Sequence, residues 1–185
     1  MTPSLQLPPR LILLSRTAAV GCWLAAIAWP TLALLALASM EPAALLHRAG
    51  VVSAAVATAA PAAGSWPHVA AVVLLALPAA MAGWALASLG VGFRALAAGG
   101  GWLPQACSAL RRFAGWSAAA AVGGVVAAAA ASVLLTLGFP PGQRALAVGG
   151  SSALLQELLV AALVWVFAHL LLRAHAVAEE NAQFV

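Results

Sequence analysis

The stretch FAGWSAAAAVGGVVAAAAASVLLTL, from Phe113 to Leu137, contains no charged residue. An α-helix needs about 20 apolar residues to cross the hydrocarbon core of a bilayer, so this stretch is long enough to span it. Gly138 and the two prolines after Phe139 end the helix. Three more blocks have the same apolar character, at Thr17–Ser39, His68–Phe93 and Ser152–Leu172. The sequence therefore predicts an all-α protein, a four-transmembrane-helix bundle that forms a single domain over residues 1–185.

Composition agrees with a membrane protein and excludes several other classes. The chain has 185 residues, of which 65% are hydrophobic and 6% are charged, whereas soluble domains carry about 25% charged residues. The mean hydropathy is +1.06. The net charge of +4 comes from arginines that flank the apolar blocks. Since they form no basic stripe with interleaved aromatic residues, we expect no direct binding to nucleic acid.

The arginines predict the orientation of the chain. With the N-terminus inside, two arginines, Arg48 and Arg144, lie outside. Cytoplasmic flanks of membrane spans carry an excess of positive charge, so the predicted topology is N-in/C-in, as a multi-pass protein of the bacterial cytoplasmic (inner) membrane. The first block exceeds the ~7–15 residues of a signal-peptide core, so we expect an uncleaved span. The six arginines predicted to be cytoplasmic are Arg10, Arg16, Arg94, Arg111, Arg112 and Arg173.

The connections between the blocks differ in length. Met1–Arg16 is expected to lie outside the first helix, at the membrane surface or without fixed structure. Met40–Pro67 is expected to be an irregular loop with a short interfacial helix in the apolar stretch Val51–Ala60. Ser65 is a candidate N-cap for the second long helix, with Pro67 in the first turn. The third helix is expected to begin near Pro104, and the fourth to continue beyond the lipid through Glu179 or Glu180.

Small residues recur every four positions in the third block, at Gly115, Ala119, Gly123, Ala127 and Ala131. Helices in membranes pack closely through small residues, so this series predicts a contact face, either within the chain or between copies in a homo-oligomer. An alanine-rich block also produces such spacing by chance.

Glu157 is the residue with the clearest chemical interest. An ionisable group within a membrane helix usually faces a partner or a wet cavity, so Glu157 is a candidate intramembrane functional carboxylate. The alternative is an interfacial glutamate near the outer end of its helix that pairs with Arg144 or His68. His169 lies 12 residues further on, about 18 Å along the helix, and is too distant to act with Glu157 directly.

No residue pattern predicts catalysis, a cofactor or a metal site. Cys22 and Cys107 lack metal-ligand spacing, and we expect both to be free thiols. Phosphate-binding glycine motifs and nucleophile motifs are likewise missing from the sequence. We therefore expect no catalytic residue, no cofactor and no metal, and do not expect an enzyme.

Two stretches carry a resemblance to a known family. The first runs from Phe93-Arg94 through Gly99 and Trp102 to Leu110-Arg111-Arg112-Phe113-Ala114-Gly115-Trp116. The second is Arg173–Asn181, which ends in Glu179-Glu180-Asn181, followed by the final Val185. Together they resemble the bacterial membrane family catalogued as domain of unknown function 2975. This chain departs from that pattern with Trp102 in place of phenylalanine. The resemblance implies no enzymatic activity, and it implies membrane sequestration of a small helix-turn-helix regulator.

Two functional hypotheses follow. In the first, the protein contacts lipid headgroups or a cytoplasmic regulatory partner through the Gly99–Phe113 connection and the Arg173–Val185 tail. In the second, the protein is a small transporter or channel subunit that uses Glu157 in a wet cavity. The residues assigned to partner or headgroup contact are Arg94, Arg111, Arg112, Arg173, Glu179 and Glu180.

Overall fold

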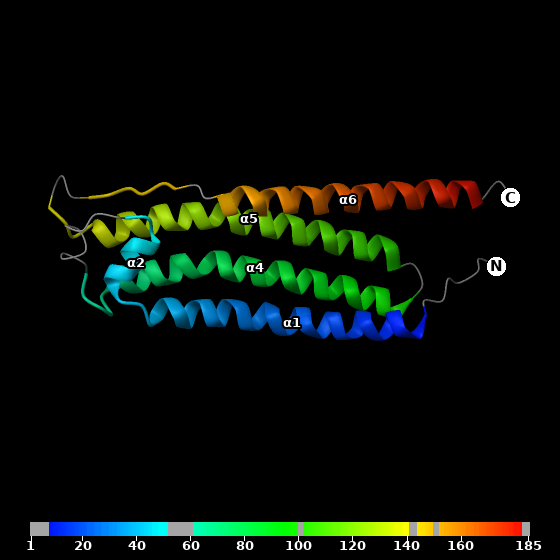
Figure 1. The fold of residues 1–185 in the computed structure, drawn as a ribbon, viewed down its shortest axis with the longest axis horizontal. Coiled ribbons are helices and arrows are strands. Elements are labelled where there is room, and N and C mark those ends of the chain that lie inside the picture. Colours follow the sequence, from blue (N-terminus) through cyan, green and yellow to red (C-terminus); the bar gives the residue numbers. More distant parts are fainter. Residues whose placement is uncertain (1–7, 52–60, 100–101, 141–143, 150–151, 183–185) are drawn as a thin grey trace. The chain divides into compact units, whose positions relative to one another are not determined.

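The computed structural model describes residues 8–51, 61–99, 102–140, 144–149 and 152–182. Over these ranges the chain forms helices and no strand, which confirms the all-α prediction (Figure 1). Four helices are long and apolar enough to cross a membrane, as an integral membrane protein requires. The helices are α1 (Pro9–Ala38), α2 (Pro42–Arg48), α4 (Trp66–Ala98), α5 (Trp102–Thr136) and α6 (Ser152–Ala182).

The chain divides into two compact units. Unit 1 comprises Met1–Ile27, Gly83–Ala118 and Gln156–Val185, and unit 2 comprises Ala28–Ala82 and Ala119–Leu155. The helices α1, α4 and α5 each contribute residues to both units, while α6 belongs almost wholly to unit 1.

Unit 2 has a core of large apolar side chains built around the short helix α2. Leu45 and Leu46 of α2 are buried, with 0% and 2% of their surface exposed. They belong to one cluster with Leu37 of α1, Val72 of α4 and Leu135 of α5. Glu41 precedes α2 in an extended conformation and Pro42 occupies its first turn, a combination that favours a helix start. The helix α2 therefore packs into unit 2 by its leucine face, while His47 and Arg48 remain exposed.

Residues 144–149 are extended and run along α5 within unit 2. The backbone N–H of Ala145 donates to Thr136 Oγ1 at 3.3 Å, and that of Ala147 donates to Ser132 Oγ at 3.1 Å. Ser132 and Thr136 are buried, so their hydroxyls supply acceptors that buried backbone donors require. Because Ala145 meets Thr136 and Ala147 meets Ser132, the segment turns back along α5 toward that helix's start.

Unit 1 packs through small residues. A Cβ added at Gly90 of α4 would lie 2.8 Å from Trp23 Nε1 of α1, and one added at Gly92 would lie 2.9 Å from Ala109 Cβ of α5. Trp84 and Trp116 add an edge-to-face contact between α4 and α5, with ring centroids 6.3 Å apart. Close approach of helices at glycine and alanine is the packing mode expected in a bilayer.

The predicted small-residue face of the third block is confirmed in one half. In unit 2, Ala127 and Ala131 are buried, and a Cβ at Gly123 would lie 3.4 Å from Met81 Sδ of α4. In unit 1, a Cβ at Gly115 would meet nothing within 4 Å. Gly115 is therefore no part of a contact face within unit 1.

Several helix boundaries correct the sequence predictions. The expectation that Met1–Arg16 lies outside the first helix is wrong from Pro9 onward, because Pro9 opens α1 and the Pro8 carbonyl accepts from Leu11 N–H at 2.9 Å. The predicted interfacial helix at Val51–Ala60 lies outside the described residues apart from Val51, and a short helix that was not predicted, α2, precedes this stretch.

The boundaries of α4, α5 and α6 lie close to expectation. Ser65 stands at the N-cap position of α4, but its buried Oγ has no hydrogen-bond partner among the described residues. Gly99, with φ +68, follows the last residue of α4, as is common where helices end. The helix α5 begins two residues before the expected Pro104, and α6 continues past Glu180 as predicted.

Candidate functional site

Arg111 of α5 contacts Trp165 of α6 in unit 1. The Arg111 guanidinium carbon lies 5.2 Å from the centroid of the Trp165 ring, a cation–π arrangement. Arg111 belongs to the connection that the sequence predicted as a contact surface, and Trp165 lies eight residues before Arg173 in the second predicted surface. The structure therefore places a residue of the first predicted contact segment against α6, eight residues before the second segment begins. Trp165 itself was not predicted to take part.

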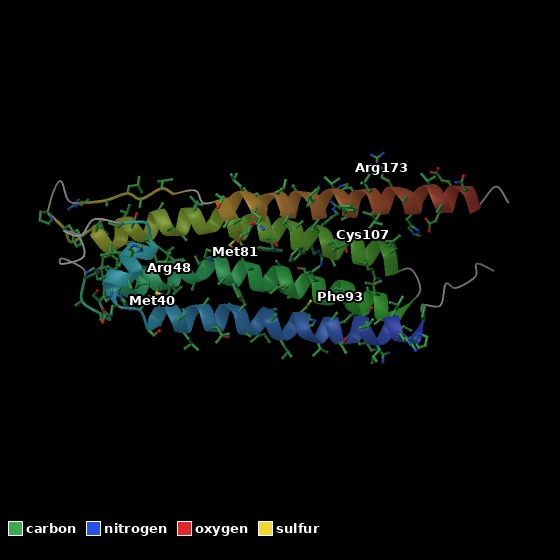
Figure 2. The ribbon with its side chains drawn as sticks, in the orientation of Figure 1. Met40, Arg48, Met81, Phe93, Cys107 and Arg173 are labelled. Carbon is green, nitrogen blue, oxygen red and sulfur yellow. The ribbon has the colours of Figure 1, made fainter. Side chains whose placement is uncertain are left out.

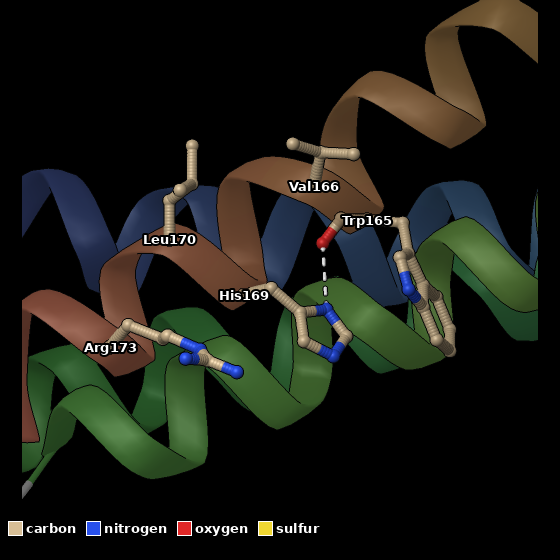
Figure 3. A pocket seen from close by; sticks show the side chains of 5 residues that line it. All are labelled: Trp165, Val166, His169, Leu170 and Arg173. Atoms are coloured by element: carbon tan, nitrogen blue, oxygen red, sulfur yellow. Dashed lines mark hydrogen bonds between the residues drawn. The ribbon is translucent and has the colours of Figure 1, made fainter.

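Trp165, His169 and Arg173 form one stripe along α6, since residues four apart share a helix face. The three side chains project from the same side of the helix in Figure 3. His169 Nδ1 lies 3.1 Å from the Trp165 carbonyl oxygen, and the two ring centroids are 5.4 Å apart. Because a carbonyl oxygen only accepts, this hydrogen bond forms in the tautomer that carries a proton on Nδ1.

A shallow groove of about 300 Å³ follows this stripe, with Val166 and Leu170 completing its lining. The groove offers an arginine, an imidazole and an indole, which suits an anionic group flanked by apolar surface. We call Arg111, Trp165, His169 and Arg173 the basic–aromatic surface. A second groove, of about 160 Å³, lies between α4 and α5 around Phe93 and is lined by apolar residues.

The register of α5 and α6 shows that α6 projects past the start of α5. Trp165 is 17 residues from the end of α6 at Ala182, and Arg111 is nine residues from the start of α5 at Trp102. At 1.5 Å per residue these lengths are about 26 Å and about 14 Å, so α6 extends about 12 Å further. The predicted contact residues Glu179 and Glu180 are exposed on this extension, where His175 Nε2 lies 3.2 Å from Glu179 Oε1.

The arginines are distributed between the two units in the same way as the sequence analysis predicted for the two membrane faces. Unit 1 holds all six arginines that were predicted to be cytoplasmic, and unit 2 holds Arg48 and Arg144. Arg94 and Arg112 are exposed on α4 and α5, and Arg111 is half-buried. Arg48 lies on α2 and Arg173 on α6 (Figure 2). Arg144 donates through Nε to the Phe139 carbonyl oxygen at 3.4 Å.

Glu157 lies on α6 eight residues before Trp165, about 12 Å along the helix from the residue that contacts Arg111. Its position near the outer end of a membrane span stays a prediction. A charge at the centre of a span costs about 2.5–3.5 kcal/mol on insertion scales.

Glu157 is also exposed on α6 and lines neither groove. Its two predicted partners both belong to unit 2, where Arg144 contacts Phe139 and His68 is buried with no partner at Nδ1 among the described residues. The use of Glu157 in a wet cavity stays a prediction.

Comparison with known proteins leaves the family open. No protein-family model matches the sequence, and neither a curated protein nor a solved structure does so. The cysteines are free, Cys107 buried and Cys22 half-buried. In the described ranges no group of three or more histidine, cysteine or acidic residues could hold a metal ion.

Proposed function

We propose that this protein is a non-enzymatic, multi-pass protein of the bacterial cytoplasmic membrane that engages a cytoplasmic partner. Its contact surface combines the basic–aromatic surface with the extension of α6 from Arg173 onward. Both chain ends face the cytoplasm in this proposal, because the flanks that contain the six arginines of unit 1 then face inward.

The observation that carries the proposal is the extension of α6. The helix α6 extends about 12 Å beyond the start of α5. This extension is longer than the helix end needs to anchor itself in lipid headgroups. The extension carries Glu179 and Glu180 exposed on its surface, and acidic side chains gain nothing from an anionic lipid surface. A protein partner with basic residues gains from them.

The resemblance to the family catalogued as domain of unknown function 2975 suggests the class of partner. A small helix-turn-helix regulator presents a basic surface because it neutralises phosphates on DNA. Binding of that surface to Glu179 and Glu180 competes with DNA, so the membrane protein would sequester the regulator. This mechanism needs no catalytic residue in the membrane protein.

Crosslinking and mass spectrometry in native membranes test the proposal. We expect a cytoplasmic protein to crosslink to the wild-type chain and to be lost when Arg173–Val185 is deleted. The matched control is Glu41→Arg, which changes a carboxylate in unit 2 and is expected to leave the crosslinks unchanged. Full retention of the crosslinked protein by the deletion variant, while that variant still sediments with membranes, would refute the proposal.

A further inference from the structure

The groove along α6 joins a positive charge to an apolar surface. Arg173 is exposed, and its side chain extends toward His169 in Figure 3. Trp165 and His169 lie up to about 80° to one side of Arg173 around the helix, and Val166 and Leu170 lie up to about 60° to the other side. All five residues line the groove of about 300 Å³ and belong to unit 1. The groove therefore suits a ligand that has both an anionic end and an apolar end.

The Arg173 guanidinium has no acidic neighbour on its own helix face. Side chains three and four residues away are the neighbours on a helix surface, and for Arg173 these are His169, Leu170, Ala176 and Val177. The acidic residues of unit 1 are Glu157, Glu179 and Glu180. The nearest of them in sequence, Glu179, is about 9 Å away along the axis, and its Oε1 lies 3.2 Å from His175 Nε2. The charge of Arg173 is therefore available to an anionic ligand.

The Trp165 ring forms a wall of the groove that other side chains hold in place. The Arg111 guanidinium carbon lies 5.2 Å from the centroid of this ring, and the centroid of the His169 ring lies 5.4 Å from it. Arg111 is half-buried and does not line the groove itself. It therefore orients Trp165 and adds positive charge beside the groove. Tryptophan is enriched at the level of the lipid headgroups, so this wall suits contact with lipid.

An apolar track leads from Arg173 toward the start of α6. Leu163, Val166 and Leu170 are between 51% and 59% exposed and lie within about 80° of Arg173 around the helix, all to the same side. Leu163 is ten residues from Arg173, which is about 15 Å along the axis. Half of a hydrocarbon core about 30 Å thick has the same length. The track therefore matches an acyl chain that crosses one leaflet.

We propose that this groove binds one anionic phospholipid. The phosphate oxygens accept hydrogen bonds from the Arg173 guanidinium, whose planar fork matches their geometry. One acyl chain of the lipid lies along Leu170, Val166 and Leu163. The Trp165 ring closes the groove on the side of α5, where Arg111 holds it.

The apolar track favours a phospholipid over a free phosphate. A free phosphate pairs with Arg173 but leaves Leu163, Val166 and Leu170 uncovered, whereas a phospholipid covers them with its acyl chain and gains from the burial of apolar surface. A lipid in the groove leaves Glu179 and Glu180 free for the proposed cytoplasmic partner, and its binding requires no partner.

Native mass spectrometry of the detergent-solubilised chain tests which ligand is bound. Phosphatidylglycerol and phosphatidylcholine with identical acyl chains are added in turn at equal concentration. We expect the chain to retain phosphatidylglycerol in preference, because its headgroup has a net negative charge. Glycerol 3-phosphate in excess is expected not to displace the lipid, since it has the anion without the acyl chain. Equal retention of both lipids, or displacement by glycerol 3-phosphate, would overturn the proposal.

Substitution of arginines in the same assay tests the position of the site. Arg173→Gln is expected to lower the apparent affinity for phosphatidylglycerol on the order of tenfold, because the charge-assisted hydrogen bonds to the phosphate are lost. The matched control is Arg112→Gln, which removes the same charge from an exposed position of α5 outside the groove and is expected to keep the affinity. Equal affinity of the two variants would contradict the proposed site. A wild-type chain that retains no phosphatidylglycerol would refute lipid binding and leave the surface to the proposed partner.

Discussion

Gly92 and Gly115 form a matched pair of glycines within long helices of unit 1. A Cβ added at Gly92 would lie 2.9 Å from Ala109 Cβ and 3.8 Å from the Ala106 carbonyl oxygen. A Cβ at Gly115 would meet nothing within 4 Å. Carbon atoms pack best at about 3.5–4.0 Å, so Gly92→Ala forces α4 and α5 apart by close to 1 Å. Side-chain rotation gives no relief because both Cβ atoms are fixed to the backbone.

The size of the effect follows from a comparison of the two variants. Overpacking costs about 1–3 kcal/mol, while replacing glycine by alanine inside a helix gains close to 1 kcal/mol at either site. The gain cancels in the comparison, so we expect Gly92→Ala to be less stable than Gly115→Ala by about 1–3 kcal/mol. The free energy of unfolding is measured by tryptophan fluorescence during denaturation of the detergent-solubilised protein. Equal stability of the two variants within about 0.5 kcal/mol would show that α4 and α5 do not meet at Gly92.

Three substitutions test unit 2 by the same unfolding assay. Leu45→Ala leaves a cavity at a side chain that is 0% exposed and should cost about 2–5 kcal/mol; a cost under 1 kcal/mol would mean that α2 is not packed into the core. Thr136→Val removes the acceptor of the Ala145 N–H and should cost about 1–3 kcal/mol, with faster hydrogen exchange at Ala145; unchanged exchange would contradict that hydrogen bond. Gly123→Ala should be nearly neutral, because the flexible Met81 side chain, 3.4 Å away, can move by the few tenths of an ångström required; a loss above 2 kcal/mol would show a tighter contact.

The long helices could be predicted from the sequence because their signal is local. A run of about 20 apolar residues without charge indicates a membrane helix whatever its neighbours are. The extension of α6 through Glu179 or Glu180 was likewise predicted, and the helix ends at Ala182. The first residue of α5 was predicted to within two residues, because Pro104 suits the first turn of a helix.

The elements that were missed depend on contacts between residues far apart in the sequence. The helix α2 has seven residues, about two turns, which is too short a stretch for a repeating apolar pattern to be recognised. Its leucines are buried because α1, α4 and α5 surround them. Residues 144–149 contain no helix, and the hydroxyls of Ser132 and Thr136 hold them against α5. The alternation of alanine with Leu146 and Val148 is the one local sign of an extended segment.

The depth of Glu157 in a membrane stays a prediction that depends on where α6 begins. Counting residues from the start of α6 gives the depth only if that helix begins at the membrane surface. The contact between Arg111 and Trp165 instead relates positions on α6 to positions on α5. This contact could not be predicted, because neither residue specifies the register of the two helices. Arg111 and Arg173 of the basic–aromatic surface were candidate contact residues in the sequence, while Trp165 and His169, whose rings are tilted against each other, were recognised from the structure.

The orientation of the chain in the membrane is the claim on which the proposed function depends most. A reporter enzyme that is active only outside the cytoplasm, fused in separate chains after Gly50 and after Val185, measures it directly. The positions of the arginines predict an active reporter after Gly50 and an inactive one after Val185. Activity after Val185 would place the α6 extension outside the cell and contradict the account.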